Sequence, residues 1–296
     1  MRAFIALVRR EQIEHRGAFL IAPLGLVAIL FGATILAFTV GRVDARFSGA
    51  MMTLAPLRVF ALGFLGIGFA WVLYLIATLF FYCADGFAAD RRNNAMLFWK
   101  SMPVSDLRIL LAKLVATLTI FPATIYVVSL LSSALLMAVA VITSNISTGN
   151  GMALFGNIVD IYLQVAGSTL LALVLGLLWY VPYMALVGAM ATVVGRWAIP
   201  LSLLLPSLLA LLEWVTLGGL SPIHTRVWNY LAYRSDFKLA DGYLESWFHA
   251  EGTFSLSEFA SDLIARIDWV QMGIGWLFAV GVIYLASEYR RRYNDN

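Results

Sequence analysis

The sequence predicts an all-α integral membrane protein, and its composition, its uncharged segments and the distribution of its basic residues support this class. Apolar residues fill 61% of the 296 positions and charged residues 12%, whereas soluble domains average about 45–50% and 25%. In lipid, a long uncharged run can satisfy its backbone polar groups only as a helix. We therefore expect one transmembrane domain over residues 1–296, with six membrane-spanning helices.

Six apolar segments are long enough to cross roughly 30 Å of hydrocarbon. All except the fifth are free of charged residues, and the fifth is interrupted only by Glu213. Several prolines lie within these segments, as lipid-embedded helices tolerate. The expected spans are Gly17–Val40, Val59–Ala84, Leu114–Ile142, Ile161–Gly195, Trp197–Leu217 and Trp269–Ser287.

The distribution of basic residues predicts the orientation of these spans. Six spans put both termini on one side, which carries thirteen of the 20 Lys and Arg residues, and the opposite side carries seven. Loops rich in Lys and Arg stay in the cytoplasm. We expect a multi-pass protein of a bacterial inner membrane with both termini in the cytoplasm.

The longest hydrophilic connection, residues 218–268, is expected to form an outer insertion between the fifth and sixth spans. Within it, Ser255 and Glu258 have the spacing of a capping box that opens a helix. Apolar residues follow at helical spacing, so this helix should lead into the last span. Its role is either a plain amphipathic connector or a gate.

The first sixteen residues are expected to form a helix at the cytoplasmic surface of the membrane. Met1–Arg16 mixes apolar residues with four arginines and two glutamates. An amphipathic basic helix of this kind lies in the interface and is attracted to anionic lipid.

The connection between the second and third spans, residues 85–105, has an unusual composition. Charged residues come first, then the apolar cluster Met96–Trp99, and then Pro103. Aromatic residues rimmed by charge indicate a protein contact. We expect this segment to bind a partner on the cytoplasmic side.

This segment resembles the coupling helix of the permeases of type V ABC exporters, as does the order of spans around it. The family pattern is acid, base, acid, any residue, Gly-Thr, an apolar run and Pro-Val-Ser; Arg92 and Asn94-Ala95 depart from it. The resemblance implies a permease paired with a second copy or a paralogue, with one cytoplasmic ABC ATPase docked on each. The ATPase-coupling residues it implies are Asp90, Arg91, Met96, Leu97, Phe98, Trp99, Pro103, Val104 and Ser105.

No nucleotide-binding or catalytic motif is expected in the chain itself. A P-loop needs Gly-Lys before Ser or Thr, but Lys100 is the only lysine followed by Ser, and Trp99 precedes it. ATP and magnesium would therefore be bound by the partner ATPase, and the chain is not expected to be an enzyme. The three histidines lie outside the spans and Cys83 is the only cysteine, so no metal site is expected.

Glu213 is the one acidic residue well inside an expected span. An intramembrane carboxylate is a candidate to contact cargo, to hold a partner helix or to serve in a gate, although Glu213 near the outer interface would simply be hydrated. We expect a hydrophobic or amphipathic cargo, membrane lipid as surroundings and no nucleic acid partner. A non-transporting scaffold or sensor and a secondary transporter remain the alternatives.

Overall fold

All regular secondary structure in the computed structural model is helical among the residues that it describes, which are 2–40, 56–92, 105–148, 151–217, 225–237, 242–249 and 254–293. Within these ranges six helical segments are long and apolar enough to cross a membrane. The prediction of an all-α chain with six such segments is confirmed, and the segments support a multi-pass membrane protein.

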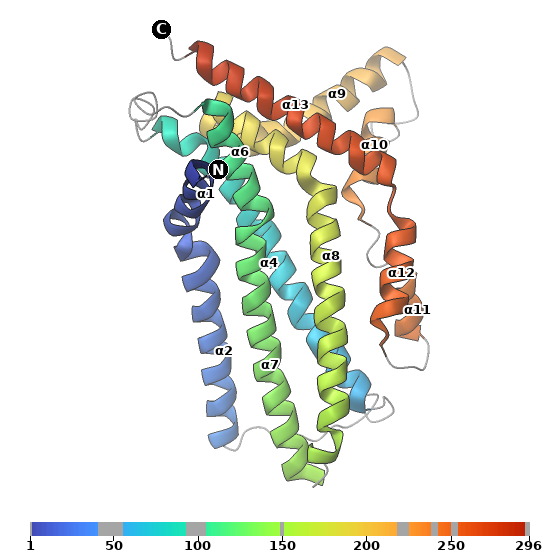
Figure 1. Ribbon diagram of the computed structural model, residues 1–296. Coiled ribbons are helices and arrows are strands. Elements are labelled where there is room, and N and C mark those ends of the chain that lie inside the picture. Colours follow the sequence, from blue (N-terminus) through green and yellow to red (C-terminus); the bar gives the residue numbers. More distant parts are fainter. Residues whose placement is uncertain are drawn as a thin grey trace.

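The helices follow one another as the sequence periodicity and length predict, with additional short helices between residues 226 and 266. Their labels are those of Figure 1. The elements are α1 (Arg2–Glu14), η1 (Gly17–Ile21), α2 (Ala22–Thr39), α4 (Pro56–Arg92), α6 (Asp106–Leu118), α7 (Ile120–Thr148), α8 (Gly151–Val194), η2 (Gly195–Trp197), α9 (Ala198–Leu217), α10 (Arg226–Ser235), α11 (Tyr243–His249), α12 (Leu256–Arg266) and α13 (Trp269–Tyr293).

Several helices extend beyond the expected spans, among them α13, which continues past Ser287 to Tyr293. Helix α4 continues through Asp85 to Arg92, α8 begins at Gly151, and the third candidate span begins at Asp106. A charged residue ends an uncharged run in the sequence, but it need not end a helix if its charge is paired or solvated. Lys113, which directly precedes the expected third span, therefore lies inside the helical run.

Helices α4, α7 and α8 pack against one another, and α2 runs beside α7 (Figure 1). Helix α1, the start of α6 and the end of α13 lie together at one end of this bundle (Figure 1). An apolar core near that end includes Leu79, Leu110 and Phe121. A second core joins α4, α8 and α12 through Phe64, Ile158 and Phe259, among others.

The expected insertion contains α10, α11 and α12. Ser255 caps α12, since its hydroxyl accepts the Glu258 N–H at 3.4 Å, and this helix leads into α13. The predicted start of α12 is confirmed. Helix α12 packs on α8 (Figure 1), where the Leu256 N–H donates to the Gln164 side chain at 3.2 Å. We did not predict α10 and α11, because neither begins with the capping-box spacing that marks α12.

Candidate functional site

The structure describes the two ends of the predicted coupling segment, residues 85–92 and Ser105. Asp90 and Arg91 lie in the last turn of α4, and exposed Ser105 directly precedes α6. The rest of the predicted set, Met96, Leu97, Phe98, Trp99, Pro103 and Val104, lies outside the described residues, so its role stays a prediction. The helices on either side of it, α4 and α6, are both described.

A buried carboxylate of α1 lies against both of these helices. Glu11 is only 5% exposed. The Tyr82 hydroxyl of α4 donates to Oε2 of Glu11 at 2.7 Å. The Lys113 ammonium of α6 lies 3.2 Å from Oε1 of the same carboxylate. One side chain of α1 therefore binds α4 and α6 at once.

Lys113 completes a triangle among these three helices. Its ammonium also donates to the backbone carbonyl of Gly86 in α4 at 2.8 Å. Removing an ammonium or a carboxylate from water costs several kcal/mol, unless an opposite charge and hydrogen bonds compensate. Here both ions have such partners, so they can lie in an apolar environment. We call Glu11, Tyr82, Gly86 and Lys113 the Glu11 cluster.

The tight packing of the cluster leaves no space for a side chain at Gly86. A Cβ at this position would lie 2.9 Å from the Tyr82 ring, closer than real Cβ contacts. The ring has little room to move, since it meets His15 and Phe121 edge-on, each with a centroid distance of 4.7 Å. A glycine thus keeps the Tyr82 hydroxyl in line with Glu11.

Aromatic stacking fixes the chain that leaves α1. Phe19, in the π-helical turn, stacks on Phe121 of α7 with ring centroids 3.9 Å apart and planes 11° apart. The Nδ1–H of His15 donates a hydrogen bond to the Glu11 carbonyl at 3.1 Å. Helix α1 therefore contacts α4 and α6, and the turn that follows it packs on α7, although we expected α1 only at the membrane surface.

A second ionic contact holds the start of α6. Arg290 of α13 is 5% exposed, and its Nε lies 3.3 Å from the Asp106 carboxylate. The geometry at Nε is not that of a hydrogen bond, so the contact is chiefly electrostatic. Asp106 is in the first turn of α6, where a negative charge also suits the helix dipole. Helix α6 is thus tied to α13 as well as to α1.

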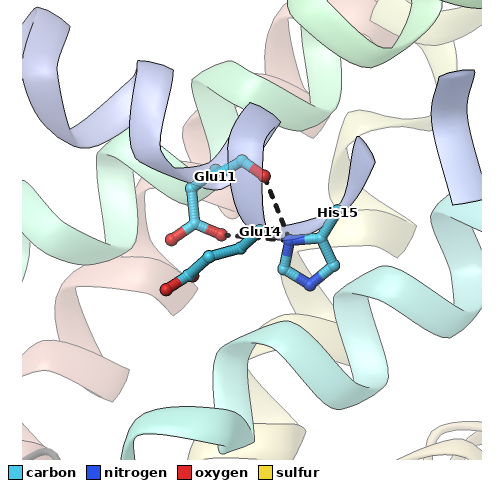
Figure 2. A group of neighbouring side chains, drawn as sticks. All are labelled: Glu11, Glu14 and His15. Carbon is cyan, nitrogen blue, oxygen red and sulfur yellow. Dashed lines mark hydrogen bonds and ion pairs between the residues drawn. The ribbon is translucent and has the colours of Figure 1, made fainter. Parts of the chain in front are cut away.

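Figure 2 shows Glu11, Glu14 and His15, whose side chains gather at the end of α1 and in the residue that follows it. Two carboxylates and an imidazole could in principle hold a metal ion. Glu14, however, pairs with Arg10 at 2.7 Å, and Glu11 already binds Tyr82 and Lys113. Helical spacing and ion pairing account for this group without a metal.

Glu213 lies near the end of α9 and binds α10. Its two carboxylate oxygens each accept a backbone N–H at 3.0 Å, one from Arg226 and one from Val227. These are amides of the first turn of α10, which have no partner within the helix. The carboxylate therefore caps a neighbouring helix, and a role in cargo binding or gating stays a prediction.

No family model, no curated protein and no solved structure matches the chain.

Glu11 and Lys113 were not among the residues that we predicted from the sequence. Lys113 sits between apolar residues of α6, and Glu11 is one of two glutamates in a basic helix. The isolated lysine beside a long apolar run was the available signal, because a buried ammonium needs a carboxylate. Its partner could not be chosen from sequence alone.

Proposed function

We propose that this chain is the permease subunit of an ATP-driven exporter of the ABC type, and that residues 85–105 receive the force of a separate cytoplasmic ATPase. The observation that best supports the proposal is the Glu11 cluster with the Asp106–Arg290 pair. These contacts tie both helices that border the segment to α1, and they tie α6 to α13 as well.

Through the Glu11 cluster and the Asp106–Arg290 pair, a movement of the segment would reach other helices of the membrane domain. A displacement of Met96–Met102 would act on α4 and α6 through the chain itself. Lys113 would pass it to α1, and Asp106 would pass it to α13. Close-packed interiors transmit strain, so the four helices would move as one body.

The expected roles of individual residues follow from their chemistry. Phe98 and Trp99 would fill an apolar groove on the ATPase, while Asp90 and Arg91 would fix the register by ion pairs. Two ATPase copies, with ATP and magnesium, would drive two permease copies or a permease and its paralogue. A hydrophobic or amphipathic cargo would pass between the two, and the insertion of residues 218–268 would gate its release.

The orientation that this scheme needs is supported by charge. Both α1 and the last turn of α13, with Arg290, Arg291 and Arg292, lie at the end of the bundle where α6 starts (Figure 1). Arginines at a membrane surface favour the cytoplasmic side. We therefore propose an inner-membrane protein with both termini, and the segment 85–105, in the cytoplasm.

Co-purification with the ATPase tests the proposal. A Phe98→Ala/Trp99→Ala double variant should lose the ATPase and lose transport, because the apolar anchors would be gone. A Phe155→Ala/Trp269→Ala variant, which removes two exposed aromatic residues elsewhere, is the matched control and should keep both. Unaltered ATPase binding and transport in the first variant would reject the proposal.

One observation favours a second candidate, a secondary transporter. The ionisable pair Glu11 and Lys113 is buried beside apolar helices, and buried ionisable groups in membrane proteins often serve ion or proton coupling. A purified chain that transports cargo along a proton gradient without any ATPase would favour this candidate.

A neighbouring reading frame that encodes an ABC ATPase would favour the exporter, and its absence would favour a scaffold.

A further inference from the structure

Helix α8 contains a proline at position 182, in the middle of a candidate span. Proline has no N–H and its ring crowds the carbonyl four residues earlier, so the carbonyl of Leu178 loses its helical partner. In a membrane such an acceptor finds no water and is costly unless another donor reaches it. Helix α8 changes direction in this part of the bundle (Figure 1).

Two side chains from other helices donate to carbonyls of α8 at this point. The indole N–H of Trp276 in α13 donates to the Leu178 carbonyl at 2.9 Å. The guanidinium of Arg234 in α10 donates to the next carbonyl, that of Trp179, also at 2.9 Å. The acceptor freed by Pro182 is thus satisfied by a residue far away in the sequence.

Arg234 and Trp179 are joined by reciprocal hydrogen bonds, because each side chain donates to the backbone carbonyl of the other residue. The Trp179 indole N–H donates to the Arg234 carbonyl at 2.8 Å, and the Arg234 guanidinium lies 3.9 Å from the Trp179 ring centroid. Arg234 is 3% exposed. Its Nη1 makes no hydrogen bond within the described part of the chain, so the observed arrangement leaves one buried donor unsatisfied.

Gly275 provides the space for these contacts. A Cβ at this position would overlap the Arg234 guanidinium and would lie 3.2 Å from the Pro182 ring. Helices α8, α10 and α13 therefore meet at the proline with little space between them. A change of the α8 angle would break both donations and expose two backbone acceptors to lipid.

We propose that Trp276 and Arg234 form a clasp that locks the bend of α8 at Pro182. The clasp makes the angle of α8 depend on the positions of α10 and α13. A movement of the insertion that contains α10 would release the bend, and a movement of α8 would displace the insertion. This device does not rest on the proposed export function, because it follows from the contacts around Pro182 alone.

Spin-label distances across the bend test the clasp. In a Cys83→Ala background, labels at Val174→Cys and Val193→Cys lie on exposed sites of α8 on either side of Pro182. Nineteen residues of straight helix span about 28 Å, which is within range of pulsed electron paramagnetic resonance. The full chain in lipid nanodiscs should give one narrow distance distribution.

Trp276→Phe removes the indole N–H and keeps a ring, and it should broaden and shift the distribution. Arg234→Gln should do the same and raise amide hydrogen exchange in α10 roughly tenfold, as expected for the loss of a buried hydrogen bond. Trp269→Phe and Arg226→Gln, exposed residues of the same two helices, are the matched controls and should leave the distribution unchanged.

A Pro182→Ala background separates the clasp from general packing. The alanine supplies a backbone N–H that can donate to the Leu178 carbonyl, so Trp276→Phe should no longer broaden the distribution in this background. Equal broadening with and without Pro182, or no change in Trp276→Phe and Arg234→Gln, would overturn the proposal. Trp276→Phe keeps an aromatic ring at this position. The comparison of Trp276→Phe with and without Pro182 therefore decides the question even if Arg234→Gln does not fold.

Discussion

Glu11 of α1 and Lys113 of α6 form an ion pair of 3.2 Å in which the side chains are only 6% and 4% exposed. A helix that merely lay on the membrane surface would keep its glutamates in water. This pair instead ties α1 to α6, and the Tyr82 hydroxyl ties the same glutamate to α4. The stability of the helical bundle should therefore depend on both partners of the pair.

Lys113→Met should destabilise the protein strongly, because Glu11 would keep a buried charge without its cation. Loss of one partner from a buried pair costs about 3–5 kcal/mol. The Glu11→Gln/Lys113→Met double variant should recover at least about 1 kcal/mol, as expected for residues in direct contact. Equilibrium unfolding in mixed micelles measures both values.

The matched control for this pair is Glu14→Gln, on the same helix. The Glu14–Arg10 pair is largely exposed, and exposed pairs contribute about 0–1 kcal/mol. A similar loss of stability in Glu14→Gln and Lys113→Met would contradict the view that burial makes the Glu11 cluster important.

Gly86→Ala should lower stability, although alanine favours a helix by about 1 kcal/mol over glycine. The new methyl group would push the Tyr82 ring from Glu11, and overpacking of this kind costs about 1–3 kcal/mol. Gly66→Ala in the same helix is the control, because its Cβ would meet no atom within 4 Å. The thermal unfolding midpoint of Gly66→Ala should lie above that of the parent protein, and the midpoint of Gly86→Ala should lie below it. The reverse order would rule out the packing argument.

Asp268 should make stability depend on acid pH. The Gln271 N–H and then the Tyr233 hydroxyl donate to its carboxylate at 3.0 Å each and hold its pKa below the usual value. A lowered folded-state pKa gives stabilisation that is present above the unfolded pKa of about 4, and this stabilisation is lost as pH falls through the folded value.

Asp268→Ala should therefore lower the thermal midpoint at neutral pH, and the difference from the parent should shrink below about pH 4. Asp268→Asn, which keeps an acceptor without the charge, serves as the comparison. A difference between parent and Asp268→Ala that stays constant from pH 7 to the most acid sample would show that the charge has no part in capping α13.

Glu213→Ala should loosen α10, since the N–H groups of Arg226 and Val227 would lose their acceptors. Loss of a helix cap costs about 1 kcal/mol, and hydrogen exchange at these two amides should rise accordingly. Glu245→Ala, an exposed acidic residue of α11, should leave them protected. Unchanged exchange in Glu213→Ala would mean that the carboxylate does not serve as the cap.

The sequence allowed the six spans, the start of α12 and the helix at the N-terminus to be predicted, because each depends on local composition or spacing. Ser255 is an example, since a cap needs only residues within one turn. The Glu11 cluster could not be predicted in this way. Its members come from three separate helices, and their contact depends on how those helices pack.

The extent of the helices was also underestimated, for a physical reason. We ended the spans at charged residues because an isolated charge is costly in lipid. Lys113 escapes this cost through Glu11 and the Gly86 carbonyl. The carbonyl freed by Pro182 is a similar case, because its donor, Trp276, lies on a helix that the sequence alone does not place beside it.

Photo-crosslinking from position 98 in living cells would show whether a cytoplasmic ATPase binds residues 85–105. With a benzophenone amino acid in place of Phe98, we predict an adduct with a cytoplasmic protein that carries the Walker motifs of an ABC ATPase. The same group in place of Phe155, an exposed residue near the start of α8, should give no such adduct. Labelling of position 98 by a membrane-impermeant reagent from outside the cell, with no ATPase adduct, would contradict the proposed coupling.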